Sequence, residues 1–246
     1  MCYVGPPTPS MKQRAMDHPY WPLFDLRILT QRVEIRLPDD DVLAELAQLA
    51  LKGVHDPALM PFLHPWTDAP QNEIGQGMMR WGWRHRATWC PNDWSFGGAV
   101  FVNGQVVGVQ SLMAVDFAAL RSIKSGSWLG LAHQGKVIGK EMRSAMLQFA
   151  FETLGAEEAL SGGFYDNESS LGDSRALGYE ESGRRTISRR GIPTEMIDLR
   201  IDRFKWRNGA HPEVEIQGFE ECRNFFISAS IEERSEPPSA MGVPIP

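Results

Sequence analysis

The segment 133–140, HQGKVIGK, lies between a strand-like run and an amphipathic helix, and it constrains the fold more than any other part of the sequence. A helix start leaves several backbone N–H groups unpaired and carries the positive end of the helix dipole, so it can bind an anion. Two glycines let the backbone approach a phosphate, and Lys136 and Lys140 add positive charge. The segment predicts a phosphate-binding loop, and a plain glycine turn that caps a core helix is the structural alternative.

The spacing of this segment excludes two familiar phosphate loops. No Gly-Lys-Ser/Thr sequence ends it, so it is not a Walker loop, and its glycines do not match the dinucleotide fingerprint. The anion is therefore expected to belong to another kind of ligand.

Hydrophobic periodicity predicts a mixed α/β domain with a largely antiparallel sheet of six to seven strands. The run 32–37 alternates like a half-buried strand, and Asn103-Gly104 between two apolar runs predicts a hairpin with Gln105 as a bulge residue. Helices are expected over 39–50, 71–89, 136–154 and 167–177, and further strands over 97–102, 106–114, 125–131, 157–164, 179–188 and 194–201.

The ends of the chain are expected to lie outside this domain. Residues 1–20 and 232–246 are rich in Pro and Ser and lack apolar periodicity, which is typical of a flexible extension and a flexible tail. The main domain is expected over 21–202, with a small C-terminal appendage over 203–231.

Charge and composition narrow the partners. The formal net charge of −6 argues against general affinity for nucleic acid. No apolar run approaches the roughly 18 residues that span a bilayer. The 3 cysteines have no metal-like spacing, so neither a disulfide framework nor a metal site is predicted. We therefore expect a cytoplasmic protein whose partner is a small molecule or another protein.

Two longer patterns resemble the RimJ/RimL-like branch of the GNAT acyltransferases. The first, WLG-x-x-HQGK-x-x-G-x-E, begins at Trp128, and the second, DN-x-x-S-x-x-x-S-R-x-x-GY, begins at Asp166. The resemblance covers roughly 28–201 in layout and 126–183 in motif detail. It implies the GNAT fold, in which the strands expected at 125–131 and 157–164 splay apart, and a CoA thioester as co-substrate.

By this resemblance, the loop that binds the CoA pyrophosphate through backbone N–H groups falls on 134–139, with Val137 in place of the usual middle glycine. The preceding strand would offer a backbone N–H to the thioester carbonyl. Asn167 would lie beside the pantetheine arm, and Ser174 takes the place of a tyrosine that protonates the departing thiolate. The implied CoA-binding residues are Trp128, Leu129, Gly130, Leu131, Gln134, Gly135, Lys136, Val137, Ile138, Gly139, Lys140, Asn167, Ser170 and Ser174.

The acceptor side is less constrained by the sequence. Direct attack on the thioester requires an acceptor for the amine proton. The candidates are an ordered water or one of the side chains His55, Asp56, His64, Asp116 and Asp166. The long Pro-rich loop 54–70 is expected to line the acceptor site. Structural histidines and core tryptophans are the plainer alternative for the candidate substrate-binding residues, which are His55, Asp56, His64, Trp66 and Trp83.

The acyl donor and the acceptor stay open. The loop sequence GVHDPALMPFLHPW is similar to that of actinobacterial GNATs that include a succinyl-CoA-using enzyme, so acetyl-CoA and succinyl-CoA are both expected donors. An acidic acyl group would need a cation, for which Arg121, Lys124 and Arg143 are candidates.

The expected activity is N-acylation of a small molecule or peptide in a ternary complex, in bacterial specialised metabolism or detoxification. A CoA-binding module with weak turnover, a protein N-terminal acetyltransferase, and a homodimeric assembly are alternatives left open.

Overall fold

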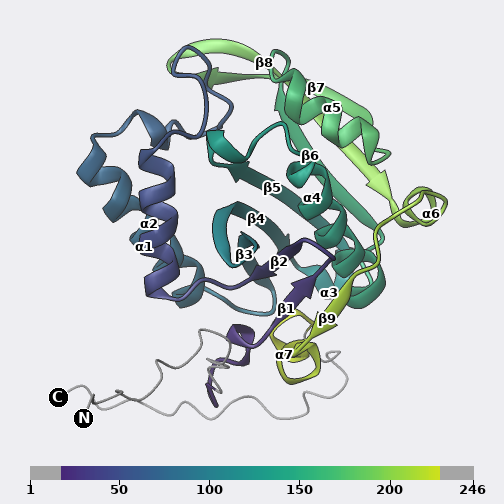
Figure 1. The fold of residues 1–246 in the computed structure, drawn as a ribbon. Helices are drawn as coiled ribbons and strands as arrows, with labels where there is room; N and C mark the ends of the chain where they lie inside the picture. Colours follow the sequence, from purple (N-terminus) through teal and green to yellow (C-terminus); the bar gives the residue numbers. More distant parts are fainter. Residues whose placement is uncertain (1–17, 228–246) are drawn as a thin grey trace, which may run out of the picture.

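A single sheet of nine strands forms the centre of the protein (Figure 1). The computed structural model describes residues 18–227. The predictions for 1–17 and 228–246 lie outside these residues. The strands in chain order are β1 (Arg27–Leu29), β2 (Val33–Arg36), β3 (Asp93–Val102), β4 (Gln105–Val115), β5 (Ser122–Leu129), β6 (Glu158–Phe164), β7 (Glu180–Arg189), β8 (Ile192–Asp202) and β9 (Glu215–Gln217).

The order of the strands across the sheet is β7-β8-β6-β5-β4-β3-β2-β1-β9. Neighbouring strands are antiparallel except β5 and β6, which are parallel. The predicted mixed, mostly antiparallel sheet is confirmed, with β1 and β9 as strands that the sequence did not reveal. Both are 3 residues long, too short to show a period of two.

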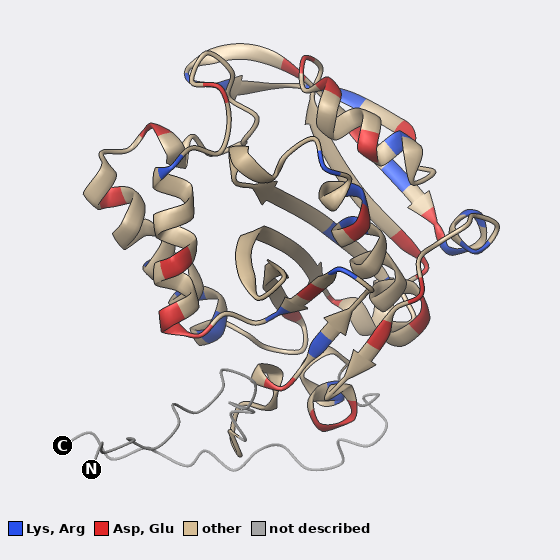
Figure 2. Cartoon of the chain, viewed as in Figure 1, with Lys and Arg blue, Asp and Glu red and all other residues tan. Residues whose placement is uncertain are grey.

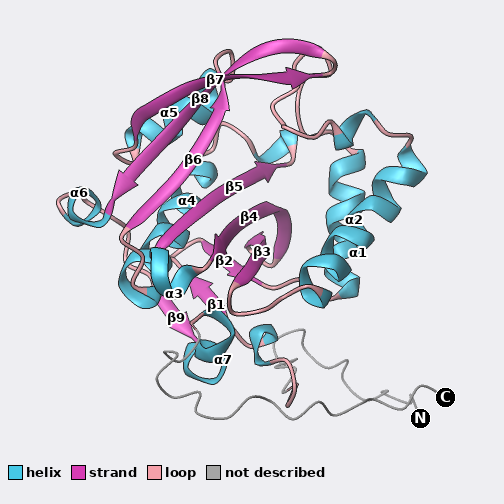
Figure 3. Cartoon of the chain, turned by 180° about the vertical axis from the view of Figure 1, so that it is seen from behind, coloured by secondary structure: helices cyan, strands magenta, loops and turns pink. Residues whose placement is uncertain are grey.

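Helices cover both faces of the sheet (Figures 1 and 3). α1 (Asp40–Leu51) and α2 (Gln71–Ala87) pack on the β3–β4 hairpin around a core that includes Leu43 and Val109. α4 (Ile138–Gln148) packs on the opposite face in a larger core. The remaining helices are α3 (Phe117–Leu120), α5 (Glu168–Ala176), α6 (Arg203–Arg207) and α7 (Phe219–Phe226).

The hairpin predicted at Asn103-Gly104 is confirmed, but its bulge lies elsewhere. Both turn residues have positive φ, 51° and 75° respectively, which a two-residue hairpin turn of the primed type requires. Gln105 pairs directly with Val102, and the register shifts further along β4, where Val107 is the extra residue. The bulge predicted at Gln105 is therefore wrong. The turn itself matches the strand twist and leaves the pairing intact beside it.

The helix predicted over 136–154 begins later and changes type near its end. Val137 has a left-handed φ of 66°, so regular helix starts only at Ile138. The last turns, Phe149–Leu154, are π-helical, and Gly155 at φ 78° ends the segment. The loop before α4 is thus two residues longer than the sequence pattern predicts, which widens the region that can contact a ligand.

The described part of 203–231 completes the main domain. β9 pairs with β1 at the edge of the sheet. The side chains of Phe219, Cys222 and Phe226 in α7 are buried in the larger core, and burial raises the pKa of the Cys222 thiol to about 12. The indole of Trp94 donates a hydrogen bond to the Phe226 carbonyl over 3.0 Å. This segment therefore supports the face of the sheet that carries α4.

Among the residues that the structure describes, no helix combines the length and the apolar character needed to cross a membrane.

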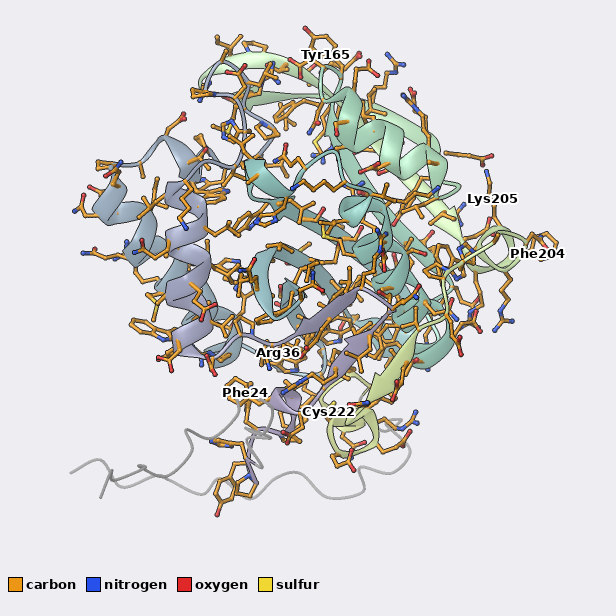
Figure 4. All side chains as sticks on the ribbon, viewed as in Figure 1. Phe24, Arg36, Tyr165, Phe204, Lys205 and Cys222 are labelled. Atoms are coloured by element: carbon orange, nitrogen blue, oxygen red, sulfur yellow. The ribbon has the colours of Figure 1, made fainter. Side chains whose placement is uncertain are left out.

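We expect Phe226→Ala to lower the free energy of unfolding by about 3–5 kcal/mol, because it empties a fully buried aromatic site. Phe204→Ala is the matched control, since Phe204 is 79% exposed and points away from the molecule (Figure 4). Urea denaturation of both variants checks the difference. Equal losses in the two variants would contradict the role assigned to α7.

Candidate functional site

A cleft opens in the middle of the sheet where β5 and β6 part. The two strands pair only at Ser122 with Glu158, Ile123 with Ala159 and Lys124 with Leu160. Beyond these pairs β5 continues alongside β4, and β6 continues alongside β8, so the two strands diverge (Figures 1 and 3). A cavity of about 1270 Å³ is lined by the diverging stretches of both strands. Their backbone groups face this cavity instead of each other.

The alternation of side chains along β5 gives the cleft two distinct sides. Ser127 points toward α4, where its hydroxyl meets Arg143. Trp128 points the other way and meets Trp66 in the loop between α1 and α2, with 5.7 Å between ring centroids. A ligand that passes between β5 and β6 would therefore connect the α4 side with the loop side.

The phosphate-binding loop predicted from the sequence forms the entrance on the α4 side. Gly135 and Val137 both have left-handed φ values, 69° and 66°. No side chain caps α4, whereas α1 and α5 are capped by Asp39 and Asn167. The first N–H groups of α4 are thus available to an anion. The loop residues that line the cleft are Gln134, Gly135, Val137, Gly139 and Lys140.

The side chain of Val137 does not obstruct this entrance. It is 63% exposed at the N-cap position. The replacement of the usual glycine instead introduces backbone strain, because Val137 adopts a left-handed φ. A β-branched residue with positive φ is a conformational outlier.

Gln134 has a structural role in the same loop. Its side-chain amide donates to the carbonyl of Val54 over 2.6 Å and to the carbonyl of Leu129 over 2.8 Å. These bonds hold the end of β5 against the segment that follows α1. The side chain therefore positions the loop, and any contact of this residue with an anion would come from its backbone.

Arg143 lies below the loop, one and a half turns into α4. Its guanidinium donates to the hydroxyls of Ser174, Ser170 and Ser127 over 2.7, 2.9 and 3.3 Å, and to the Ser170 carbonyl over 3.1 Å. Burial lowers the pKa of Arg143 from its ordinary value, although the charge of Asp173 acts in the opposite direction. Within residues 18–227 no carboxylate forms an ion pair with it, yet it lines the cleft.

Ser174, the expected proton donor, is committed to other hydrogen bonds. Its side chain is 1% exposed and does not line the cleft. The hydroxyl donates to the Ser170 carbonyl over 3.0 Å and accepts from Arg143 over 2.7 Å. The arrangement therefore does not favour proton transfer from Ser174. Asn167 does line the cleft, and its side-chain oxygen caps α5 by accepting from the Ser170 N–H over 3.3 Å.

Aromatic side chains form the loop side of the cleft. His55, Phe62, Trp66 and Trp128 make a continuous series, with 5.5, 5.3 and 5.7 Å between successive ring centroids. His55 Nδ1 lies 2.8 Å from the Asp56 carbonyl, to which it donates, and Nε2 lies 2.7 Å from the Thr67 hydroxyl. His55 is thereby fixed in orientation, and both of its ring nitrogens are occupied.

The turn between β7 and β8 fastens this loop. The Arg190 guanidinium donates to both carboxylate oxygens of Asp68 over 2.7 and 2.6 Å, and to the Pro57 carbonyl over 3.2 Å. These bonds hold the pKa of Asp68 below its usual value. Next to it, Arg189 pairs with Asp166 and lies over the Phe164 ring. Two segments far apart in the sequence, the loop 54–70 and the β7–β8 turn, are thus joined.

The structure brings some of the predicted residues together and leaves others outside. His55, Asp56, Trp128, Leu129, Leu131 and Ser170 line the cleft, in addition to the residues given above. Trp66 lies behind Trp128, and Trp83 lies on the outer side of α2, where its indole donates to Asp40. The predicted residues that do not line the cleft are Gly130, Lys136, Ile138, Ser174, His64, Asp116, Trp66 and Trp83.

Several lining residues were not predicted. Met113 on β4, Arg185 on β7 and Asp198 on β8 reach the cleft on the loop side, and Arg185 donates to Asp198 over 3.0 Å. Each lies on a strand with no recognisable motif. Only the knowledge that β4 pairs with β5, β8 with β6 and β7 with β8 would have placed them.

Charge is dispersed outside the cleft. Figure 2 shows acidic and basic residues interspersed over the visible elements. Among the residues described, no group of three or more His, Cys, Asp or Glu side chains is placed to hold a metal ion.

Comparisons with known proteins give the same fold. The family model described as "Acetyltransferase (GNAT) domain" matches residues 32–180. RimL, a ribosomal alpha-N-protein acetyltransferase solved with coenzyme A, is 18% identical over 70% of this chain and 95% of its own, at a TM-score of 0.58. Mycobacterium smegmatis RimJ, in complex with CoA-disulfide, is 16% identical over 72% of this chain and 85% of its own, at a TM-score of 0.59. A spermidine N-acetyltransferase, a chimera of SpeG from Vibrio cholerae and hSSAT, is 15% identical over 73% of this chain and 100% of its own, at a TM-score of 0.58.

Replacing Val137 with glycine should stabilise the protein. An L-residue costs about 1–2 kcal/mol in the left-handed region, whereas the added freedom of glycine in the unfolded chain costs about 0.5–1 kcal/mol. We expect V137G to raise the free energy of unfolding by up to about 1 kcal/mol, measured by urea denaturation. V137A keeps the Cβ atom and is the control, for which no such gain is expected.

Removing the Arg190 contacts should free the loop without unfolding the protein. We expect R190Q to make the segment 54–70 more susceptible to limited proteolysis, because two of its anchors, Asp68 and Pro57, are lost together. R184Q is the matched control, since Arg184 lies on the same hairpin but pairs with Glu181 and Glu195. Identical cleavage patterns in the two variants would refute the anchoring role.

Proposed function

The chain belongs to the GNAT acetyltransferase family, and we propose that it transfers an acyl group from a CoA thioester to an amine of a small molecule or peptide. The observation that carries this proposal is the parting of β5 and β6 directly beside the uncapped start of α4. This arrangement joins a phosphate-binding loop to a passage through the sheet, as a long nucleotide-linked thioester requires.

The donor half of the proposal rests on the α4 side of the cleft. The backbone N–H groups at the start of α4 would bind the pyrophosphate, with Lys140 adding charge and Gly139 allowing close approach. The pantetheine arm would then extend between the diverging strands, whose backbone groups are free to bond it. Two of the similar structures, RimL and RimJ, contain CoA or a CoA disulfide, which supports this choice of ligand.

The acceptor would enter from the opposite, loop side. The aromatic series that ends at Trp128 provides an apolar wall, and Asp56 and Asp198 provide carboxylates that could attract an amine. The contacts of Arg190 with Asp68 and Pro57 hold the loop 54–70 to the β7–β8 turn, and a loop fixed in this way favours a small acceptor over a folded protein terminus. The similar structures are named for both kinds of acceptor, ribosomal proteins and spermidine.

The proposed reaction is direct attack within a ternary complex. The cleft holds the amine next to the thioester carbonyl and so replaces a bimolecular encounter by a positioned one. A backbone N–H of β5 would stabilise the oxyanion. His64 and Asp116 lie outside the cleft, so the proton acceptor would be Asp56, Asp198 or a water bound between them.

Two acyl donors fit the proposal. Acetyl-CoA is the donor that the family membership suggests. Lys124 lines the loop side at the point where the strands part, and within the described residues it forms no ion pair. It could bind the carboxylate of a succinyl group that projects beyond the sulfur. We further propose that the protein acts in the cytoplasm.

The function is tested by incubating the protein with acetyl-CoA or succinyl-CoA and a panel of amines, and by measuring free thiol. We expect amine-dependent thiol release with at least one pair. CoA binding in calorimetry without thiol release from any pair would instead favour a binding module without turnover.

A charge reversal at Lys140 should weaken the donor site. We expect K140E to weaken CoA binding by about 5- to 30-fold, because a carboxylate then faces the pyrophosphate. K52E carries the same change in charge at the end of α1, outside the cleft, and is expected to bind CoA normally. Calorimetric titration of both variants provides the measurement.

A further inference from the structure

We propose that Arg143 is a catalytic residue that stabilises the departing CoA thiolate by its charge, in place of a hydroxyl that would donate a proton. This inference rests on the proposed function and assigns the leaving-group half of that reaction.

The first argument is the cost of a partly buried charge. Arg143 lines the cleft, its hydrogen-bond partners are three neutral serines, and within residues 18–227 it has no carboxylate in an ion pair. Asp173 acts on this charge without forming an ion pair with it. Desolvating a cation that no carboxylate hydrogen-bonds is costly, whereas the same serines could bond to one another or to neutral groups. The unpaired charge is explained if the cleft receives an anion during the reaction.

The second argument is position. Arg143 bonds to Ser127 on β5 and to Ser170 on α5, so it bridges the two elements that flank the cleft on the α4 side. A donor held by its pyrophosphate at the start of α4 extends toward this junction, where the gap between β5 and β6 begins. A thioester that enters the gap would therefore bring its sulfur atom next to the guanidinium.

The third argument is that nearby hydroxyls are unsuited to donate a proton. Ser174 gives its proton to the Ser170 carbonyl and does not line the cleft. The Tyr179 hydroxyl lies 3.5 Å from the Ser125 hydroxyl, does not line the cleft either, and burial raises its pKa to about 12. Ser174 instead accepts from Arg143 and acts as a positioning residue for it.

The chemistry balances without a protonated leaving group. The amine nitrogen attacks the carbonyl carbon and forms the C–N bond, and its proton passes to a base or water on the loop side. The tetrahedral intermediate then breaks its C–S bond, and the electron pair goes to sulfur. Thiols have pKa values of about 8.5, so a thiolate beside a cation is a stable leaving group near neutral pH. The thiolate takes a proton from solvent after release.

A different anion could in principle use Arg143, namely the carboxylate of a succinyl donor. The alternation along β5 argues against this use, because Ser127, the partner of Arg143, points to the α4 side, whereas Lys124 points to the loop side. An acyl chain that extends beyond the sulfur moves away from Arg143 and toward Lys124. The loss of Arg143 should therefore affect both donors alike.

The main test compares R143M and R143K with the wild-type protein. With acetyl-CoA and with succinyl-CoA, we expect R143M to lower kcat by about 100- to 1000-fold, the effect of removing one preorganised charge stabiliser, with KM changed only a few-fold. R143K keeps the charge and should lose less than R143M, and added guanidinium should partly restore R143M. R207M is the control with unchanged activity, because Arg207 pairs with Glu152 on the surface.

A second variant separates charge from proton donation. S174A removes the hydroxyl but keeps Arg143, so we expect less than a 10-fold loss of kcat. A loss with S174A as large as that with R143M would overturn the proposal, since it would identify the hydroxyl as the active group. A loss of kcat in R143M that is confined to succinyl-CoA, or a change in its KM alone, would also overturn the proposal. S174A and R143K remain informative even if R143M does not fold.

A third measurement does not depend on turnover. The thiol of CoA bound to the wild-type protein should ionise at a pH at least about one unit lower than when bound to R143M, with R143K in between, followed by the ultraviolet absorbance of the thiolate. An unchanged ionisation pH would refute the role of Arg143. Absence of thiol release by the wild-type protein with every amine, together with the expected ionisation shift, would instead refute the proposed function alone.

Discussion

The site depends on one limit to β-sheet pairing, namely that β5 and β6 stay together for only three residue pairs. Beyond these pairs β5 follows β4 and β6 follows β8, because the antiparallel ladders on those two sides continue uninterrupted. Two strand edges inside the sheet are left to face a cavity instead of each other. An opening of this kind would be costly in an empty core, since buried backbone groups need partners. It is tolerated where a ligand or water supplies them.

Helix α4 adds the second component, because it begins beside this opening. Its start is uncapped, and a valine in the left-handed region sets its direction. Six residues after this valine, Arg143 places a partly buried charge against the same opening. Strain at Val137 and desolvation at Arg143 both lower stability, and both are found where the protein would contact the thioester. The free energy of burying the rest of the core, including the part around Phe226 in α7, offsets these local losses of stability.

The two sides of the cleft differ in how they are held. The α4 side is built mainly by one continuous stretch of chain, from β5 through the loop into α4, with α5 packed beside it, and Gln134 ties the loop to the end of β5 and to Val54. The loop side is assembled from distant segments, with Arg190 bonded to Asp68. Substrate choice can therefore change on the loop side without disturbing the donor side, which is consistent with one fold serving several acceptors.

The sequence by itself determined the local features: the strand, loop and helix unit around 133–140, the Asn103-Gly104 turn, and the family resemblance in the same region. These follow from residues that are neighbours in the chain, where glycine positions, capping and periodicity act directly. The tertiary structure alone decided the commitment of Ser174 to Arg143, the exclusion of His64 and Asp116 from the cleft, and the arrival of Met113 and Asp198 in it. Those outcomes depend on which strands pair and on which side chains the pairing buries, and no single segment encodes that information.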